Sequence, residues 1–240
     1  MTPPVEVSLA WAGDGAAHLR GLMNRLGDDA FAAPSALPGW TRAHVLTHVA
    51  RNADAMINLL TWAKSGVETP AYASDDQRDA DIAAGATRTP AEIRADVEET
   101  SDRLSHVVKK MPEEAWSVTV RHRDGTELPA SRVPWMRARE MWVHAVDLDA
   151  GASFADMPVP MAVELVDDVA ADLSRRPGIP AIRLVAAEDG REWTVGDVSG
   201  PAVRVVGPLA DLAAWLSGRG RSRAVRRDDG TAPPDLPGWL

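Results

Sequence analysis

The sequence contains no cysteine among its 240 residues. This absence excludes disulfide bonds, zinc sites built on thiolates and a cysteine nucleophile. A metal ion could be held only by histidine, aspartate or glutamate side chains. Any reaction that requires a thiol must therefore take its sulfur from a small molecule.

Long hydrophobic runs and an excess of positive charge are also missing. No stretch approaches the roughly 18 consecutive apolar residues of a membrane span. The chain begins Met1-Thr2-Pro3-Pro4, without the basic and apolar regions of a secretory signal. Acidic residues outnumber Lys and Arg 35 to 26, whereas nucleic-acid-binding domains are usually basic. We therefore expect a cytoplasmic monomer that binds small molecules and neither nucleic acid nor membranes.

The first part of the chain is dominated by helical patterns. Apolar residues recur at helical spacing in four long segments, residues 5–27, 41–65, 89–110 and 131–148. Thr41 is a candidate N-cap, and Thr89-Pro90-Ala91-Glu92 is a capping box with proline at the first helical position. A short acidic helix is expected at 74–86, and a hairpin turns at Asp124-Gly125. These features predict an antiparallel four-helix bundle over residues 1–152.

The character of the sequence changes after Gly151. A proline-bearing connector precedes one further helix, which is followed by three short runs typical of strands, residues 182–187, 192–195 and 202–206. A last helix is expected from Pro208 to Leu216. Residues 153–240 therefore read as a smaller α+β domain, and the whole chain is predicted to be an α+β protein of two domains.

Two of the long helices carry residues at the spacing of metal ligands. Glu140 and His144 are four residues apart and lie one turn apart on the same helix face. His44 and His48 have the same spacing on the helix 41–65, and either could supply a third ligand. A set of two histidines and one glutamate suits a catalytic zinc ion with an open fourth position, although iron and manganese also accept it. Asp147 could accept a hydrogen bond from a ligand histidine. On an exposed face, the Glu–His pair would be only a weak ion pair.

Two segments resemble a known family. Leu-Pro-Gly-Trp-Thr-Arg-Ala-His-Val-Leu-Thr-His-Val-Ala-Arg-Asn-Ala at 37–53 and Val-Pro-Trp-Met-Arg-Ala-Arg-Glu-Met-Trp-Val-His-Ala-Val-Asp-Leu at 133–148 closely resemble mycothiol-dependent maleylpyruvate isomerases, within the DinB-like metal-binding bundle superfamily. Shorter matches occur at 61–63, 66–72, 129–131 and 218–220. The resemblance extends over nearly the whole length and is sparse between about 160 and 205.

The resemblance implies both a metal site and a cofactor. It implies a zinc ion bound by His48, Glu140 and His144, and thus favours His48 over His44. It also implies that mycothiol is the thiol cofactor, and that Arg219, in Gly218-Arg219-Gly220, reaches the active site from the second domain and is needed for turnover.

The implied reaction converts maleylpyruvate to fumarylpyruvate in gentisate degradation. Conjugate addition of a zinc-activated thiolate lowers the order of the carbon–carbon double bond, and elimination after rotation gives the trans isomer. Arg219 would stabilise the developing enolate or pair with a substrate carboxylate. Alternative carboxylate binders near the ligand helices are Arg42, Arg137 and Arg139. Nearby tryptophans are expected mainly in the core, with some of them lining the pocket: Trp40, Trp62, Trp135 and Trp142.

Two other functions remain open from the sequence. One is a different mycothiol-dependent S-transferase or detoxifying enzyme on the same metal-binding bundle. The other is a regulatory bundle that binds a metal or a partner protein without catalysis. A regulatory bundle would need neither an open coordination position nor Arg219.

Overall fold

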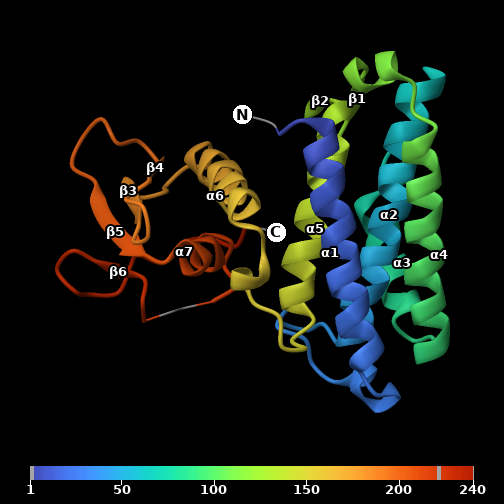
Figure 1. The fold of residues 1–240 in the computed structure, drawn as a ribbon, viewed down its shortest axis with the longest axis horizontal. Coiled ribbons are helices and arrows are strands. Elements are labelled where there is room, and N and C mark those ends of the chain that lie inside the picture. Colours follow the sequence, from blue (N-terminus) through green and yellow to red (C-terminus); the bar gives the residue numbers. More distant parts are fainter. Residues whose placement is uncertain (1–2, 221–222, 240) are drawn as a thin grey trace. The chain divides into compact units, whose positions relative to one another are not determined.

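The computed structural model describes residues 3–220 and 223–239. The chain divides into two compact units, and the boundary between them along the sequence lies between Ala152 and Ser153 (Figure 1). The first unit is mainly helical and the second contains helices and a sheet. The predicted fold class, α+β with a four-helix bundle followed by a smaller α+β part, is confirmed. No helix in the described ranges combines the length and the apolar character needed to cross a membrane.

Four long helices form the first unit, as the sequence predicts. Their bounds are α1 Val5–Arg25, α2 Arg42–Ser65, α4 Pro90–Lys109 and α5 Val133–Asp147. The predicted caps form as well. Thr41 and Thr89 each accept a hydrogen bond from the backbone three residues on, and Glu92 completes the second capping box. These caps fix where α2 and α4 begin.

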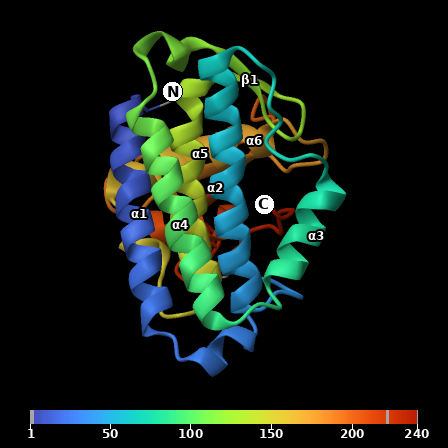
Figure 2. The same ribbon diagram turned by 90° about the vertical axis from the view of Figure 1, so that its right-hand side faces the viewer.

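The bundle does not simply alternate up and down. In Figure 2, α2 and α4 run in one direction, and α1 and α5 run in the other. Ion pairs follow the same order, because Arg51 of α2 meets Asp96 of α4, and Asp54 meets Arg103 further along. Helix α3, Asp75–Gly85, lies in the crossover that returns the chain from the end of α2 to the beginning of α4. The crossover thus lies beside α2, and its side chains can contact functional residues on that helix.

The contact between α1 and α5 is close. A Cβ atom added at Gly15 would lie 2.8 Å from Met141 Cβ and from the Trp142 ring. Trp142 also donates a hydrogen bond from Nε1 to the Trp11 carbonyl, at 2.9 Å. This contact seats one face of α5 firmly against α1, and α5 also packs against α2.

A small hairpin connects α4 to α5. Its strands are β1 Thr119–Arg121 and β2 Glu127–Pro129, paired antiparallel. The hairpin predicted around Asp124-Gly125 therefore forms, and a 3-10 turn over residues 113–117 precedes it. The fourth long helix, predicted from residue 131, begins at Val133, because residues 130–132 form another 3-10 turn.

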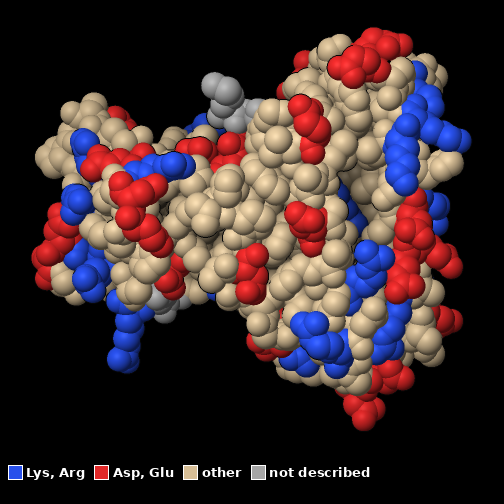
Figure 3. Space-filling model, in the orientation of Figure 1, with Lys and Arg blue, Asp and Glu red and all other residues tan. Residues whose placement is uncertain are grey.

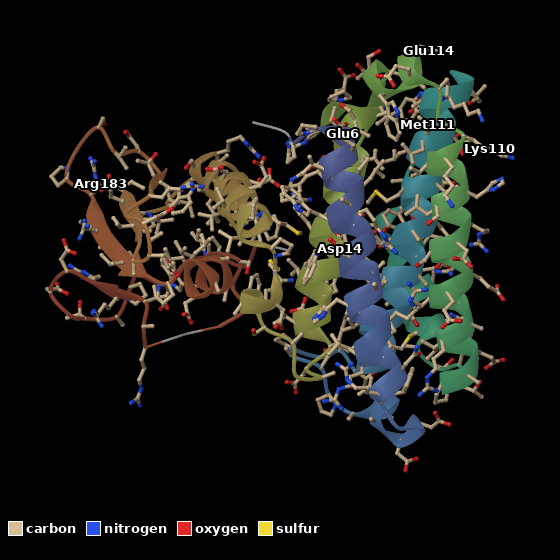
Figure 4. All side chains as sticks on the ribbon, viewed as in Figure 1. Glu6, Asp14, Lys110, Met111, Glu114 and Arg183 are labelled. Carbon is tan, nitrogen blue, oxygen red and sulfur yellow. The ribbon has the colours of Figure 1, made fainter. Side chains whose placement is uncertain are left out.

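The second unit contains a four-stranded sheet in the order β4-β3-β5-β6. The strands are β3 Ile182–Ala186, β4 Glu192–Val195, β5 Val203–Gly207 and β6 Arg226–Arg227. Strands β3 and β5 are parallel, and the outer pairings are antiparallel. Helices α6 Val159–Ser174 and α7 Leu209–Leu216 contact each other and the sheet. Figure 4 shows Arg183 projecting from β3 away from α6, in agreement with its exposure.

Charges of both signs cover the surface of the bundle. Figure 3 shows Lys and Arg interspersed with Asp and Glu over the helices on this face. Several of them are paired, including Arg94 with Asp28 at 2.7 Å and Arg103 with Asp54 at 2.5 Å. Exposed pairs of this kind contribute little to stability.

We predict that Gly15→Ala destabilises the bundle by about 1–3 kcal/mol, because the added methyl group has to displace Met141 Cβ or the Trp142 ring. Gly13→Ala on the same helix is the control, since no heavy atom lies within 4 Å of the added Cβ. That variant should gain up to about 1 kcal/mol from helix propensity. Urea unfolding measures both changes, and equal stability of the two variants would contradict the close contact.

Candidate metal centre

The structure brings three predicted ligands together between α2 and α5. His48 Nε2 lies 3.0 Å from Glu140 Oε2 and 3.0 Å from His144 Nε2, and His144 Nε2 lies 3.1 Å from the same carboxylate oxygen. All three side chains are buried. Among residues 3–220 and 223–239, they form the one group of three or more His, Asp or Glu side chains whose ligand atoms all lie within 4.8 Å of one another.

The register between α2 and α5 is fixed by a buried arginine. Arg137, one turn before Glu140, donates from Nη1 to the Val49 carbonyl at 2.9 Å and to Asn52 Oδ1 at 2.7 Å. Burial lowers the pKa of Arg137 to about 10, so the guanidinium stays charged at neutral pH. Arg137 thus acts in this structure as a clamp between the two ligand helices, not as an exposed carboxylate binder.

Asp147 accepts a hydrogen bond from His144, as the helical spacing predicts. The distance from His144 Nδ1 to Asp147 Oδ2 is 2.8 Å, and Asp147 is fully buried. Burial opposes a charge on His144, but the bonds to Asp147 and Glu140 outweigh it and raise the pKa to about 9. The same contact holds the Nδ1 proton and directs Nε2 toward the other two ligands.

Glu140 and His48 complete the cluster. Burial opposes ionisation of Glu140, but its hydrogen bonds with His144 and His48 hold its pKa well below the usual range. Burial and the positive charge of His144 lower the pKa of His48 to about 4, so this imidazole is neutral. The Trp40 ring covers it, with ring centroids 5.6 Å apart.

The arrangement fits a divalent metal ion. Ligand atoms about 2.0–2.1 Å from a tetrahedral zinc ion lie about 3.3 Å from one another. The observed separations of 3.0–3.1 Å are close to that spacing. The carboxylates of Glu140 and Asp147 also supply two negative charges to balance a dication. Three protein ligands of this type leave a fourth coordination position for an exogenous group.

His44, the alternative ligand, has a different role. Its Nδ1 lies 2.7 Å from Thr41 Oγ1 and accepts from the Thr41 backbone at 3.3 Å. It therefore belongs to the cap of α2 and stays outside the metal cluster. Trp40 is the predicted tryptophan that lies against a ligand, whereas Trp135 packs edge-on against Trp11 at 5.9 Å.

Two residues of the crossover also lie at the site, and sequence reasoning gave them no role there. Arg78 of α3 places Nη2 3.3 Å from His48 Nδ1. The Tyr72 ring lies beneath its guanidinium, 5.8 Å from Cζ to the ring centroid. Burial and the charge of Glu140 raise the pKa of Tyr72, so its hydroxyl stays protonated.

Arg219 belongs to the second unit, in the turn that follows α7. Its backbone N–H donates to the Ala214 carbonyl at 2.8 Å. Its Nη1 donates to the Ser217 carbonyl, also at 2.8 Å. Arg42 is tied to the end of α5, where Nε donates to the Leu148 carbonyl at 2.9 Å.

Comparison with known proteins gives two strong matches of fold and sequence. Residues 12–149 match the family model described as the mycothiol maleylpyruvate isomerase N-terminal domain. Crystal structures of a mycothiol-dependent maleylpyruvate isomerase and of its His-to-Ala mutant each match with 34% identity and a TM-score of 0.93, covering 99% of this chain and 98% of theirs. The chain belongs to the mycothiol-dependent maleylpyruvate isomerase family.

A more distant match is YfiT from Bacillus subtilis, described as a probable metal-dependent hydrolase with an unusual four-helix bundle topology. It shows 16% identity and a TM-score of 0.45, covering 60% of this chain and 85% of that one. A search of curated proteins found no match. Membership in the isomerase family confirms the resemblance drawn from residues 37–53 and 133–148.

We predict that zinc binding to the metal-free protein at pH 6 releases about one proton, because a metal must displace the proton from His144 Nε2. With a pKa of about 9, His144 is protonated at this pH, while His48, with a pKa of about 4, is already neutral. Calorimetry in buffers of different ionisation enthalpy measures the number released. Heats that do not depend on the buffer would contradict this protonation of the cluster.

Proposed function

We propose that this protein is a zinc enzyme that isomerises maleylpyruvate to fumarylpyruvate with mycothiol as its thiol cofactor, a reaction of gentisate degradation. The observation that carries the proposal is the buried His48, Glu140 and His144 cluster in a chain that matches a mycothiol-dependent maleylpyruvate isomerase over its full length. The match extends through the second unit, which favours the isomerase over an S-transferase that shares only the bundle.

His48, Glu140 and His144 would bind the zinc ion. Bound zinc supplies a Lewis acid that holds the cofactor's sulfur as a thiolate, the form that adds to an activated double bond. Once zinc displaces the proton from Nε2, Asp147 would keep the remaining proton of His144 on Nδ1, so that Nε2 would present its lone pair to the metal. The absence of cysteine means that no thiol of the chain competes for the open position.

Burial of the cluster serves the same chemistry. The three ligand side chains are at most 11% exposed, and the Trp40 ring lies against His48. A dry surrounding strengthens the attraction between the metal and a thiolate, because fewer water dipoles screen it. Arg219 would supply positive charge where the substrate's keto oxygen becomes negative.

Activity of the purified protein with maleylpyruvate tests the proposal. We expect an absorbance change that requires catalytic mycothiol, stops with a chelator and returns with zinc. His48→Ala, Glu140→Ala and His144→Ala should each lose zinc and activity, whereas His44→Ala should retain both. Mycothiol consumed in proportion to substrate would instead indicate an S-transferase, and full activity after removal of zinc would refute the metal's role.

Arg219→Ala should keep its zinc and lose turnover by about a hundredfold or more, the size expected when a group that stabilises an oxyanion is removed. Arg226→Ala, at an exposed position on β6, is the matched control and should retain the wild-type rate. Zinc content by elemental analysis and steady-state rates give the two readouts. An undiminished rate in the Arg219 variant would remove that residue from the mechanism.

A further inference from the structure

The helical unit contains a cavity of about 240 Å³, with lining residues from α1, α2, α4 and α5. Figure 3 shows the surface hollowed between α1 and α4. None of the three candidate metal ligands lines this cavity. We propose that the cavity is a second binding site, which takes a fatty acid of medium chain length with its carboxylate on Arg137.

Small residues on α1 explain why the cavity exists. Ala12, Gly13 and Ala16 line it, and a Cβ atom added at Gly13 would meet no heavy atom within 4 Å. Gly15, in contrast, packs tightly against α5. Because protein interiors are close-packed, voids much larger than a water molecule are few. An apolar cavity of about 150 Å³ is already large enough to bind benzene.

The cavity has apolar walls and an elongated shape. Met56, Leu60 and Leu104 line it and are each at most 8% exposed. The lining extends over residues 9–16 of α1 and 101–109 of α4. Each of these stretches covers about two helical turns, which is roughly 10–12 Å. An extended acyl chain fits such a shape better than a compact ring does.

Both charged residues of the lining are positive. Lys109 is exposed, whereas Arg137 is only 5% exposed. The bonds of Arg137 to the Val49 carbonyl and to Asn52 both use Nη1. Within residues 3–220 and 223–239, Nε and Nη2 of Arg137 have no hydrogen-bond partner, and no carboxylate forms an ion pair with this guanidinium. The clamp between α2 and α5 therefore leaves donors of a buried cation unused.

A buried cation without a counter-ion favours an anionic ligand. Burying a charge is costly unless the charge is paired and hydrogen-bonded. A carboxylate offers two oxygens to the N–H groups of a guanidinium, and their attraction is stronger where little water screens it. An apolar chain attached to that carboxylate would fill the rest of the cavity. A fatty acid thus matches both parts of the lining, whereas an uncharged apolar molecule would leave Arg137 unpaired.

Calorimetric titration of the zinc-loaded wild type with octanoate tests the site. Octanamide keeps the chain and lacks the charge, and acetate keeps the charge and lacks the chain. We expect octanoate to bind about tenfold or more tightly than either control, because each control loses one of the two interactions. Binding that depended only on a carboxylate at the metal would not distinguish octanoate from acetate.

Two variants fill the cavity from opposite helices without altering the Arg137 clamp. Gly13→Leu on α1 and Ser105→Leu on α4 should each weaken octanoate binding about tenfold or more, because the added side chain competes with the ligand for space. Ala17→Leu is the matched control, at an exposed position of α1 outside the lining, and should bind octanoate as the wild type does.

Substitutions of Arg137 test the charge. Arg137→Met should remove the preference for octanoate over octanamide, and Arg137→Lys should retain it, since lysine keeps the positive charge. Circular dichroism of each variant, compared with the wild type, shows whether the bundle is intact.

Three results would overturn the proposal. The first is no octanoate binding by the wild type. The second is octanoate binding that survives both filling variants, since the ligand would then bind elsewhere. The third is equal affinity of the wild type for octanoate and octanamide, which would mean that the cavity is apolar but does not recognise an anion. The inference is independent of the proposed function: a protein that binds octanoate here but does not isomerise maleylpyruvate would refute that function alone.

Discussion

The contact between α2 and α5 is the constraint on which the site depends. It places one imidazole of α2 against a carboxylate and an imidazole of α5, with ligand atoms separated by 3.0–3.1 Å. Arg137 fixes the register of this contact one turn away through the Val49 carbonyl and Asn52. Buried polar groups of this kind are costly unless satisfied, so the bundle core is organised around the cluster as much as around its apolar residues.

The direction of the helices determines what else surrounds the cluster. Because α2 and α4 run the same way, the chain must return along the bundle, and α3 lies in that return. The crossover thereby carries Tyr72 and Arg78 to the metal ligands. A simple up-and-down bundle with short loops would have placed neither of them there. The crossover thus supplies polar residues to a site whose candidate metal ligands come from α2 and α5.

Much of the bundle could be predicted from the sequence because its signals are local. Capping by Thr41 and Thr89 and the periodic apolar residues depend only on neighbours within a few positions. Spacing alone could not choose between His44 and His48, which share one helix face. The choice depends on Thr41, which engages His44 in the helix cap. The contact of Arg78 with His48 joins residues 30 positions apart, and it follows from the path of the crossover, which no local pattern encodes.

The central claim is that two histidines and one glutamate hold a zinc ion whose fourth position accepts the cofactor's sulfur. X-ray absorption at the zinc edge of the loaded protein, recorded before and after addition of mycothiol, tests it most directly. The account predicts a shell of nitrogen and oxygen ligands that gains one sulfur at about 2.3 Å when mycothiol is added. A nitrogen and oxygen shell that mycothiol leaves unchanged would contradict it.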